Sequence, residues 1–222
     1  MAERLFFKAT PKKDCKYEEV MCKFQYFNGF ALSQRQRCIE SLHKEILLKA
    51  PEANVLEVST KSTKILGKKL SAFNLLFNDK STEKLYPLEN IFQSSKVFEN
   101  GGPYLDLLDV HPREAKRDER LKTSGQLIGF KCLGITFPLE PKTMFYDWIY
   151  INALNSDKKL SKEIMKYDIF TDIEFNHKKS INCQARSAAI FCSLTTIGKV
   201  DIYLNDINIF KRVYGNVQIK TE

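Results

Sequence analysis

Apolar residues recur at helical spacing in the segment SQRQRCIESLHKEILLKAP, residues 33–51. The stripe consists of Ile39, Leu42, Ile46 and Leu47, and most of the charged residues lie outside it. Ser33 is predicted to cap the N-terminus of this helix, with Gln36 completing a capping box three residues later. Pro51 ends the run, so we expect one amphipathic helix before residue 51.

The segment before this helix, CKFQYFNGFAL, has aromatic residues interrupted by Asn28 and Gly29. Such a pattern is typical of a strand and turn, or of an extended arm. We therefore predict that residues 1–50 form an N-terminal arm and helix packed on the core, and that residues 51–222 form the main domain.

Short apolar pieces follow from Asn54 onward. The segment VLEVST is typical of a buried strand, and HPREAKRDERLK of a solvated helix with Pro112 in its first turn. Three further units are predicted: a buried helix in PKTMFYDWIYINALN, an Ala-rich helix in KSINCQARSAAIFCSLTTIG and an amphipathic unit in KVDIYLNDINIFKRVYG. Without internal repeats or linkers, this order predicts a single α+β domain, mainly helical, with a small sheet.

Charge and composition narrow the choice of function only slightly. The chain has 35 Lys and Arg residues against 27 Asp and Glu residues, a formal net charge of +8. This surplus favours a partner rich in phosphate, although many soluble proteins without such a partner are equally basic. No apolar run is long enough to span a bilayer, and the first residues lack the apolar run of a signal peptide. We therefore expect a soluble, cytoplasmic protein with no membrane partner.

The six cysteines form no CxxC pair, and the three histidines lie far from them in the sequence. Such spacing does not predict a disulfide framework or a zinc site, so we expect reduced and mostly buried thiols. The histidines His43, His111 and His177 are expected to have structural or surface roles.

Candidate chemistry lies in the segment YPLENIFQSSKVFENGG, residues 86–102. On a helix, Glu89, Gln93 and Lys96 would share one face, opposite Leu88. The face is consistent with a solvent-exposed stripe that has a weak Glu to Lys attraction. A second interpretation is a cleft in which the carboxylate acts as acid or base and the amine as nucleophile or anion contact.

Three blocks of this sequence resemble the NADAR family, named for NAD and ADP-ribose. They are LSAFNL at 70–75, YPLENIFQSSKVF at 86–98, and FTDIEFNHKKSINCQARSA at 170–188, and they occur in the family's order and separation. The resemblance covers roughly residues 54–205 and implies a NADAR/YbiA-like fold. The N-terminal arm resembles the extension found in the branch of antitoxins paired with DarT-type DNA ADP-ribosyltransferase toxins.

The resemblance implies a glycosidase that removes ADP-ribose from guanine bases in DNA, with ADP-ribose as product and a cognate DarT-type toxin as partner. It implies Glu89 as the acid and later the base. A neutral Lys96 would form a Schiff base with the opened ribose, or a charged Lys96 would contact the pyrophosphate. By the same resemblance, Asp172 is the second carboxylate, which would bind ribose hydroxyls or position water. The alternative is an ordinary turn or N-cap aspartate.

Seven further residues are expected to bind the substrate by the same resemblance: Ser71, Phe73, Asn74, Gln93, Asn182, Gln184 and Arg186. Arg186 suits bidentate contact with phosphate and Phe73 suits stacking on a base, but a lone Phe is more often part of a core. Asn182, Gln184 and Arg186 would otherwise be ordinary polar residues near a helix start. The expected chemistry uses no cofactor and no metal ion.

Two other functions fit the sequence. One is an N-glycosidase acting on small ribosylated nucleotide metabolites, and the other is a non-catalytic antitoxin that binds ADP-ribose, modified DNA or the toxin itself. The arm would either dock on the body or contact DNA through Arg35, Arg37 and Lys44. Dependence of turnover on salt separates a DNA substrate from a small metabolite.

Overall fold

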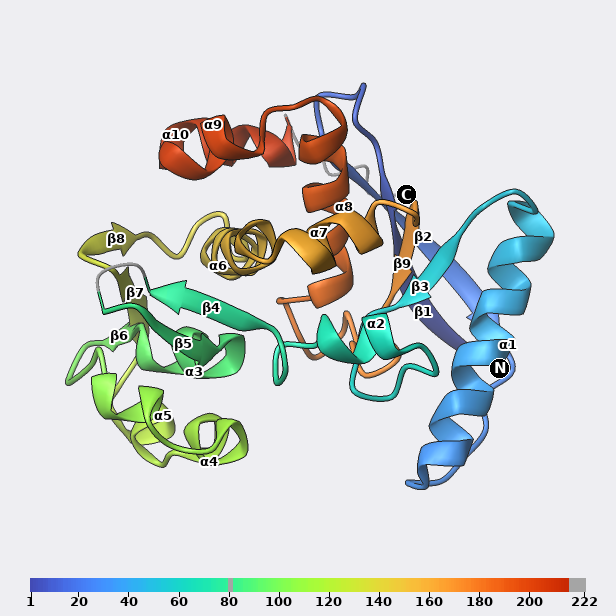
Figure 1. Ribbon diagram of the computed structural model, residues 1–222. Coiled ribbons are helices and arrows are strands. Elements are labelled where there is room, and N and C mark those ends of the chain that lie inside the picture. Colours follow the sequence, from blue (N-terminus) through green and yellow to red (C-terminus); the bar gives the residue numbers. More distant parts are fainter. Residues whose placement is uncertain (80–81, 216–222) are drawn as a thin grey trace.

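The computed structural model describes residues 1–79 and 82–215. Figure 1 shows helices α6 and α8 at the centre, with a four-stranded sheet and α1 on one side of them. Two smaller sheets and helices α3 to α5 lie on the other side. The prediction of one α+β domain with more helix than strand is confirmed.

The strands are β1 (Ala2–Ala9), β2 (Tyr17–Phe24), β3 (Val55–Glu57), β4 (Leu76–Asp79), β5 (Lys84–Pro87), β6 (Lys96–Phe98), β7 (Leu127–Cys132), β8 (Ile135–Phe137) and β9 (Ile169–Thr171). The helices are α1 (Leu32–Lys49), α2 (Ile65–Lys69), α3 (Leu88–Ser94), α4 (Pro112–Arg117), α5 (Arg120–Thr123), α6 (Met144–Ser156), α7 (Lys158–Ile164), α8 (Gln184–Thr196), α9 (Val200–Asn205) and α10 (Ile207–Phe210). Two 3-10 helices, η1 (Leu105–Leu108) and η2 (Lys211–Tyr214), complete the described elements.

The four-stranded sheet has the order β2-β1-β9-β3, in which β3 and β9 are parallel and the other pairs antiparallel. Neighbouring side chains on β1 point to opposite faces, as strand geometry requires. Phe6 packs in the cluster formed with α1, whereas Phe7 packs in the larger cluster that includes α8. The predicted buried strand in VLEVST is confirmed as β3, and its pairing places Glu57 opposite Thr171.

The N-terminal arm is continuous with this sheet, because β1 pairs directly with β9 in the register Phe7 to Phe170. Helix α1 covers the sheet face opposite α8 through Cys38, Ile39 and Leu42. The separation of residues 1–50 from the main domain stays a prediction.

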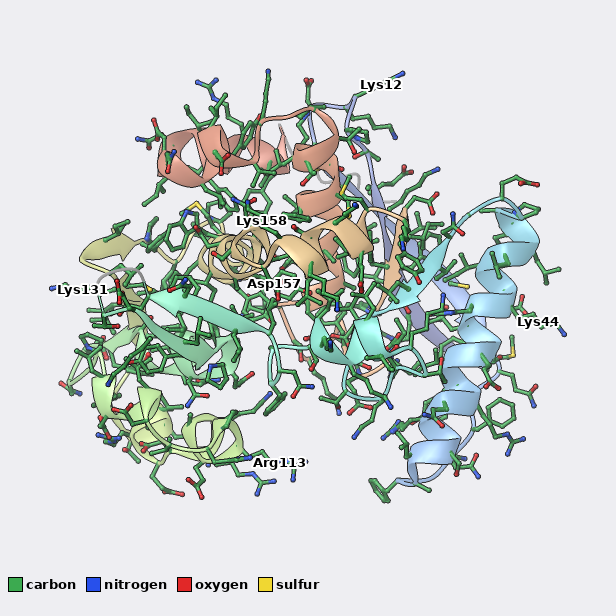
Figure 2. The ribbon with its side chains drawn as sticks, in the orientation of Figure 1. Lys12, Lys44, Arg113, Lys131, Asp157 and Lys158 are labelled. Carbon is green, nitrogen blue, oxygen red and sulfur yellow. The ribbon has the colours of Figure 1, made fainter. Side chains whose placement is uncertain are left out.

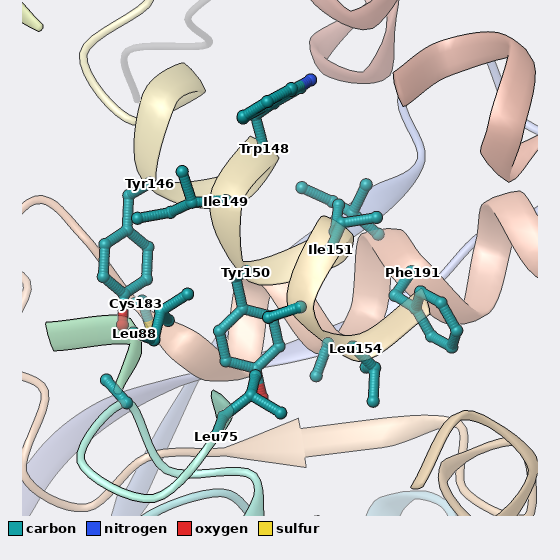
Figure 3. Packing of buried hydrophobic residues seen from close by; sticks show 14 of the residues in the cluster. Leu75, Leu88, Tyr146, Trp148, Ile149, Tyr150, Ile151, Leu154, Cys183 and Phe191 are labelled. Carbon is teal, nitrogen blue, oxygen red and sulfur yellow. The ribbon is translucent and has the colours of Figure 1, made fainter. Parts of the chain in front are cut away.

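Helix α6 is buried along nearly its whole circumference, which is typical of a core helix rather than a surface one. Figure 3 shows Tyr150, Ile151 and Leu154 of α6 surrounded by apolar residues from α8 and from residues 75–88. The hydroxyl of Tyr150 donates a hydrogen bond to the carbonyl of Leu70, at 2.8 Å. The prediction of a buried aromatic helix is confirmed, and α6 anchors the segment that contains the first NADAR-like block.

Two helix ends differ from the prediction. The N-cap of α1 is Ala31, whose carbonyl accepts hydrogen bonds from the amides of Gln34 and Arg35. Helix α1 therefore begins at Leu32, and the prediction of Ser33 as N-cap is wrong because Ser33 already lies inside the helix.

The prediction that one helix carries Glu89, Gln93 and Lys96 is also wrong. Helix α3 ends at Ser94, and Lys96 begins strand β6 opposite Phe130 of β7. At Lys96, pairing with β7, more than thirty residues later in the sequence, replaces the helical conformation. The spacing of residues within one segment does not reveal such long-range pairing.

Within the described ranges, no helix combines the length and the apolar character needed to cross a membrane. All six cysteines are free thiols, and five of them are buried.

Candidate active site

A cleft of about 910 Å³ lies between two walls of the protein. One wall is built by α3 and α4, and the other by residues 59–61 and by the segment that leads from β9 to α8. Eight of the predicted site residues line it: Ser71, Phe73, Asn74, Glu89, Gln93, Asp172, Asn182 and Gln184. Segments separated by about a hundred residues in the sequence therefore meet in this cleft.

Glu89 lies in the first turn of α3 and is only 5% exposed. Its amide donates a hydrogen bond to the carbonyl of Ala72, at 3.0 Å, which fixes the start of α3 against the first NADAR-like block. The side-chain amide of Gln93, one helical turn later, donates to Glu89 Oε1 at 2.8 Å. Lys116 Nζ of α4 lies 3.7 Å from the same oxygen. Glu89 thus has a hydrogen-bond donor and a cation beside it at the floor of the cleft.

Lys96 is half-buried on β6 and does not line the cleft. Its Nζ lies 4.9 Å from the centre of the Phe92 ring, and Phe92 itself lines the cleft. Burial lowers the pKa of Lys96; the charge of Glu89 opposes this shift, while that of Lys116 adds to it. A lowered pKa is the property that a nucleophilic lysine requires.

Asp172 directly follows β9 and is 6% exposed. Burial raises its pKa to about 8, and the nearby carboxyl group of Glu57 adds to this rise. The amide of Glu174 donates to Asp172 Oδ1 at 3.1 Å and, with the side chain of Gln184, opposes the shift. Burial and the neighbouring Glu57 therefore favour the protonated form of Asp172.

Gln184 joins the two halves of the site. As the first residue of α8, it accepts a hydrogen bond from the amide of Ala72 through Oε1, at 2.8 Å. The same side chain interacts with Asp172. Gln184 therefore ties the third NADAR-like block to the first.

Glu57 is a buried acidic residue behind the cleft that the sequence analysis missed. Its carboxylate accepts hydrogen bonds from Ser59 Oγ (2.6 Å), Thr171 Oγ1 (2.5 Å) and the amide of Ile173 (2.9 Å). His43 Nε2 of α1 lies 2.8 Å from Thr171 Oγ1, and burial lowers the pKa of His43 to about 4. Glu57 is the one acidic residue in the apolar run VLEVST. Because burying a charge is costly, an acidic residue in a predicted buried strand indicates a special role.

Ser71 and Asn74 shape the cleft wall through a shared carbonyl. Ser71 Oγ donates to the carbonyl of Lys68 at 2.7 Å, and Asn74 Nδ2 donates to the same oxygen at 2.8 Å. Gln93 Oε1 and Asn182 Oδ1 are buried atoms without a hydrogen-bond partner among the described residues. Both residues line the cleft, so these two acceptors are available to a ligand.

Arg186 lies outside the cleft lining, although the resemblance implies that it binds the substrate. Its guanidinium is buried against Asp147, at 3.3 Å, and donates to the carbonyl of Ile181 at 3.2 Å. Asp147 also accepts hydrogen bonds from the hydroxyls of Ser187 and Tyr214. The contacts of Arg186 in the structure hold α8 against α6. A contact between Arg186 and the substrate stays a prediction.

The sequence analysis did not select several basic and aromatic residues that line the cleft. They include Lys61, Arg113, Lys116, Arg117, Phe92, Tyr146 and Phe175. Helix α4 is fixed by a capping box in which His111 Nδ1 accepts from the amide of Arg113, while Glu114 accepts from the amide of His111. Lys116 Nζ lies 5.2 Å from the centre of the Phe73 ring. The sequence does indicate the basic helix that begins at Pro112, but its charge pattern predicts a solvated surface and not a cleft wall.

The arrangement combines two buried carboxyl groups, unpaired amide oxygens, aromatic rings and a basic rim. These groups can exchange protons with a substrate and bind its polar, aromatic and anionic parts. Among residues 1–79 and 82–215, no three His, Cys, Asp or Glu side chains gather as a metal-binding group.

Fold and site together define a single-domain α+β protein with a polar, basic-rimmed cleft suited to a nucleotide-like ligand. The profile of the DarT1-associated NADAR antitoxin family matches residues 2–222. The chain therefore belongs to this family, and the matched range includes the N-terminal arm. A comparison with functionally curated proteins finds no match. The family assigns the chain an antitoxin role in association with a DarT1 toxin, and NADAR proteins are generally associated with glycosidase activity.

Proposed function

We propose that this antitoxin is a hydrolase that removes ADP-ribose from guanine bases in DNA and thereby reverses the modification made by its partner toxin. The observation that carries this proposal is the convergence of Glu89, Asp172 and Gln184 in one cleft. These residues come from two of the blocks that resemble NADAR proteins, and family membership covers nearly the whole chain.

Glu89 is the proposed acid and base. As the acid, it gives its proton to the departing guanine nitrogen while the bond between that nitrogen and the ribose C1 carbon breaks. Its carboxylate then accepts a proton from the water that adds to the same carbon. The net reaction consumes one water molecule and restores Glu89. Gln93 and Lys116, at 2.8 and 3.7 Å from Glu89 Oε1, hold the carboxyl group in position through both steps.

Asp172 is proposed to act as a neutral acid at physiological pH. With a pKa of about 8, its carboxyl group keeps a proton that it can donate in a hydrogen bond to a ribose hydroxyl. Gln184 and the unpaired Asn182 Oδ1 lie in the same wall and are proposed to orient the sugar.

Lys96 offers a covalent variant of the reaction. Its neutral amine would attack the imine carbon of the ring-opened ribose, expel the guanine amine and leave a lysine imine that water hydrolyses. Adding borohydride during turnover should reduce this imine and leave an ADP-ribosyl mass on Lys96. A peptide map without that adduct, under conditions of active turnover, would favour the alternative in which Lys96 contacts the pyrophosphate.

The experiment compares two oligonucleotides, one ADP-ribosylated on guanine and one on thymidine, and follows the release of ADP-ribose by mass spectrometry. We expect release from the guanine substrate only. The exposed Glu40 on α1 supplies a matched control for Glu89→Gln, because Glu40→Gln removes the same charge far from α3. Release from neither DNA would reject the proposal in favour of a small ribosylated metabolite as substrate or of a binding-only antitoxin.

A further inference from the structure

The cationic side chains of the cleft fall into two groups. Lys116 is paired with Glu89, and the nearby carboxylate of Glu174 is paired with Arg35 of α1 at 3.5 Å. Arg113 and Arg117 also line the cleft, but within residues 1–79 and 82–215 their guanidinium groups make no ion pair or hydrogen bond. Both residues are exposed. Lys61 of the facing wall also makes no ion pair among these residues, so helix α4 supplies two of the three positive charges of the cleft that no acidic group of the described chain neutralises.

Helix α4 holds these two arginines in a fixed relation. Positions four apart in a helix lie on the same face, separated by about 6 Å along the axis. The capping box at His111 and Glu114 fixes the start of α4, and the buried Ala115 packs the helix inward. Figure 2 shows Arg113 projecting from α4 away from the body of the protein. The pair is thus a short row of charges built onto the wall that includes Glu89.

The basic residues of the N-terminal arm are arranged differently. Arg35 is engaged by Glu174 and donates a hydrogen bond to the hydroxyl of Tyr26, at 2.5 Å. The guanidinium of Arg37 lies 4.0 Å from the centre of the Phe27 ring and donates to Gln34. These contacts hold the arm to itself and to the cleft wall, whereas Arg113 and Arg117 are left for an external anion.

We propose that Arg113 and Arg117 bind backbone phosphates of the DNA strand beside the modified guanine. This inference rests on the proposed function. Glu89 and Asp172 are only 5% and 6% exposed, so a modified base must leave the base stack to reach them. The flanking nucleotides then remain outside, at the mouth of the cleft, where the two exposed arginines lie. Contacts to phosphates position a strand without reading its sequence, so these arginines select DNA over a free nucleotide.

The test uses two substrates that have the same modified base. One is a single-stranded oligonucleotide with one ADP-ribosylated guanine, and the other is the corresponding ADP-ribosylated guanosine without flanking nucleotides. For the variant Arg113→Ala, Arg117→Ala, we expect the ratio of kcat/KM for the oligonucleotide to kcat/KM for the nucleoside to fall about tenfold. We also expect the slope of log kcat/KM for the oligonucleotide against log salt to become shallower by about 1.4, or roughly 0.7 for each lost phosphate contact.

A matched control removes two positive charges from α7. The variant Lys159→Ala, Lys162→Ala changes two exposed residues outside the cleft lining, and we expect it to keep the wild-type ratio and slope. An equal fall in both variants would mean that net charge, not the α4 pair, attracts DNA. An unchanged ratio in the α4 variant would overturn the proposal. If both substrates are lost together in that variant, the arginines bind ADP-ribose itself.

A binding measurement separates this inference from the proposed function. Fluorescence anisotropy with an unmodified single-stranded oligonucleotide, at several salt concentrations, requires no turnover. If the wild type releases no ADP-ribose from either substrate, the proposed function fails. The role of the α4 arginines is then decided by whether Arg113→Ala, Arg117→Ala weakens this binding and its salt dependence, and equal binding by wild type and variant would reject it.

Discussion

The two buried carboxyl groups of the cleft, those of Glu89 and Asp172, are almost equally buried, yet their surroundings are opposite in charge. Glu89 has the amide of Gln93 at 2.8 Å and the ammonium of Lys116 at 3.7 Å. Asp172 has the carboxyl group of Glu57 near it, and its pKa rises to about 8. Two equally buried carboxyl groups can therefore differ in role: Glu89 is proposed to transfer protons, whereas Asp172, whose protonated form is favoured, is proposed to donate a hydrogen bond.

The largest expected effect is at Glu89. The variant Glu89→Gln keeps the shape of the side chain but cannot transfer a proton, so turnover should fall by about 10²- to 10⁴-fold. Cells that express the partner toxin should then lose protection, whereas Glu40→Gln should protect them as the wild type does. Full protection by Glu89→Gln would mean that the antitoxin works by binding rather than by catalysis.

Another buried carboxylate, Asp147, differs from both because its partner is an arginine. The variant Arg186→Met removes the buried cation 3.3 Å from Asp147 and leaves that charge uncompensated. We expect the free energy of unfolding to fall by about 3–5 kcal/mol, measured by chemical denaturation. A variant of wild-type stability that loses only substrate affinity would instead support the role in substrate binding that the resemblance implies.

Asp172 is expected to make stability depend on pH, with a small change for each pH unit. Because its pKa in the folded protein, about 8, lies above the unfolded value near 4, the folded protein binds more protons between these values. The stabilisation from the protonated group is complete below about pH 4 and is lost as the pH rises through 8. The slope contributed by one proton is at most about 1.4 kcal/mol per pH unit.

The variant Asp172→Asn cannot ionise, so the free energy of unfolding should depend less on pH between 5 and 8 than it does in the wild type. Denaturation curves at four pH values across this range measure the difference. The same pH dependence in both proteins would show that Asp172 does not take up the proton that its surroundings favour.

Patterns within short segments of the sequence predicted three helices of the structure. Each of three patterns indicated a helix that the structure contains: Pro112 at the start of α4, the aromatic run of α6 and the Ala-rich run of α8. The start of α1 was misplaced by two residues and the end of α3 by at least two, because backbone hydrogen bonds to Ala31 and the strand pairing of Lys96 decide these ends.

The candidate site was predictable as far as the family resemblance extends. Eight of its residues line the cleft, but the resemblance gave no reason to select Glu57 or Arg113. The surroundings of Glu57 depend on the parallel pairing of β3 with β9, which joins positions more than a hundred residues apart. The direction in which a short basic helix faces is likewise fixed by tertiary packing, and its charge pattern only indicates a solvated surface.

The most direct test of the division between the two acids is to follow the release of ADP-ribose from the guanine-modified oligonucleotide at pH 7 by wild type, Glu89→Gln and Asp172→Asn. Asn resembles the protonated form of Asp172 and still donates a hydrogen bond, whereas Gln cannot exchange the proton that Glu89 must transfer. We predict near-complete loss of release with Glu89→Gln and a much smaller loss, about tenfold or less, with Asp172→Asn. Equal losses in the two variants, or wild-type release by Glu89→Gln, would contradict the account.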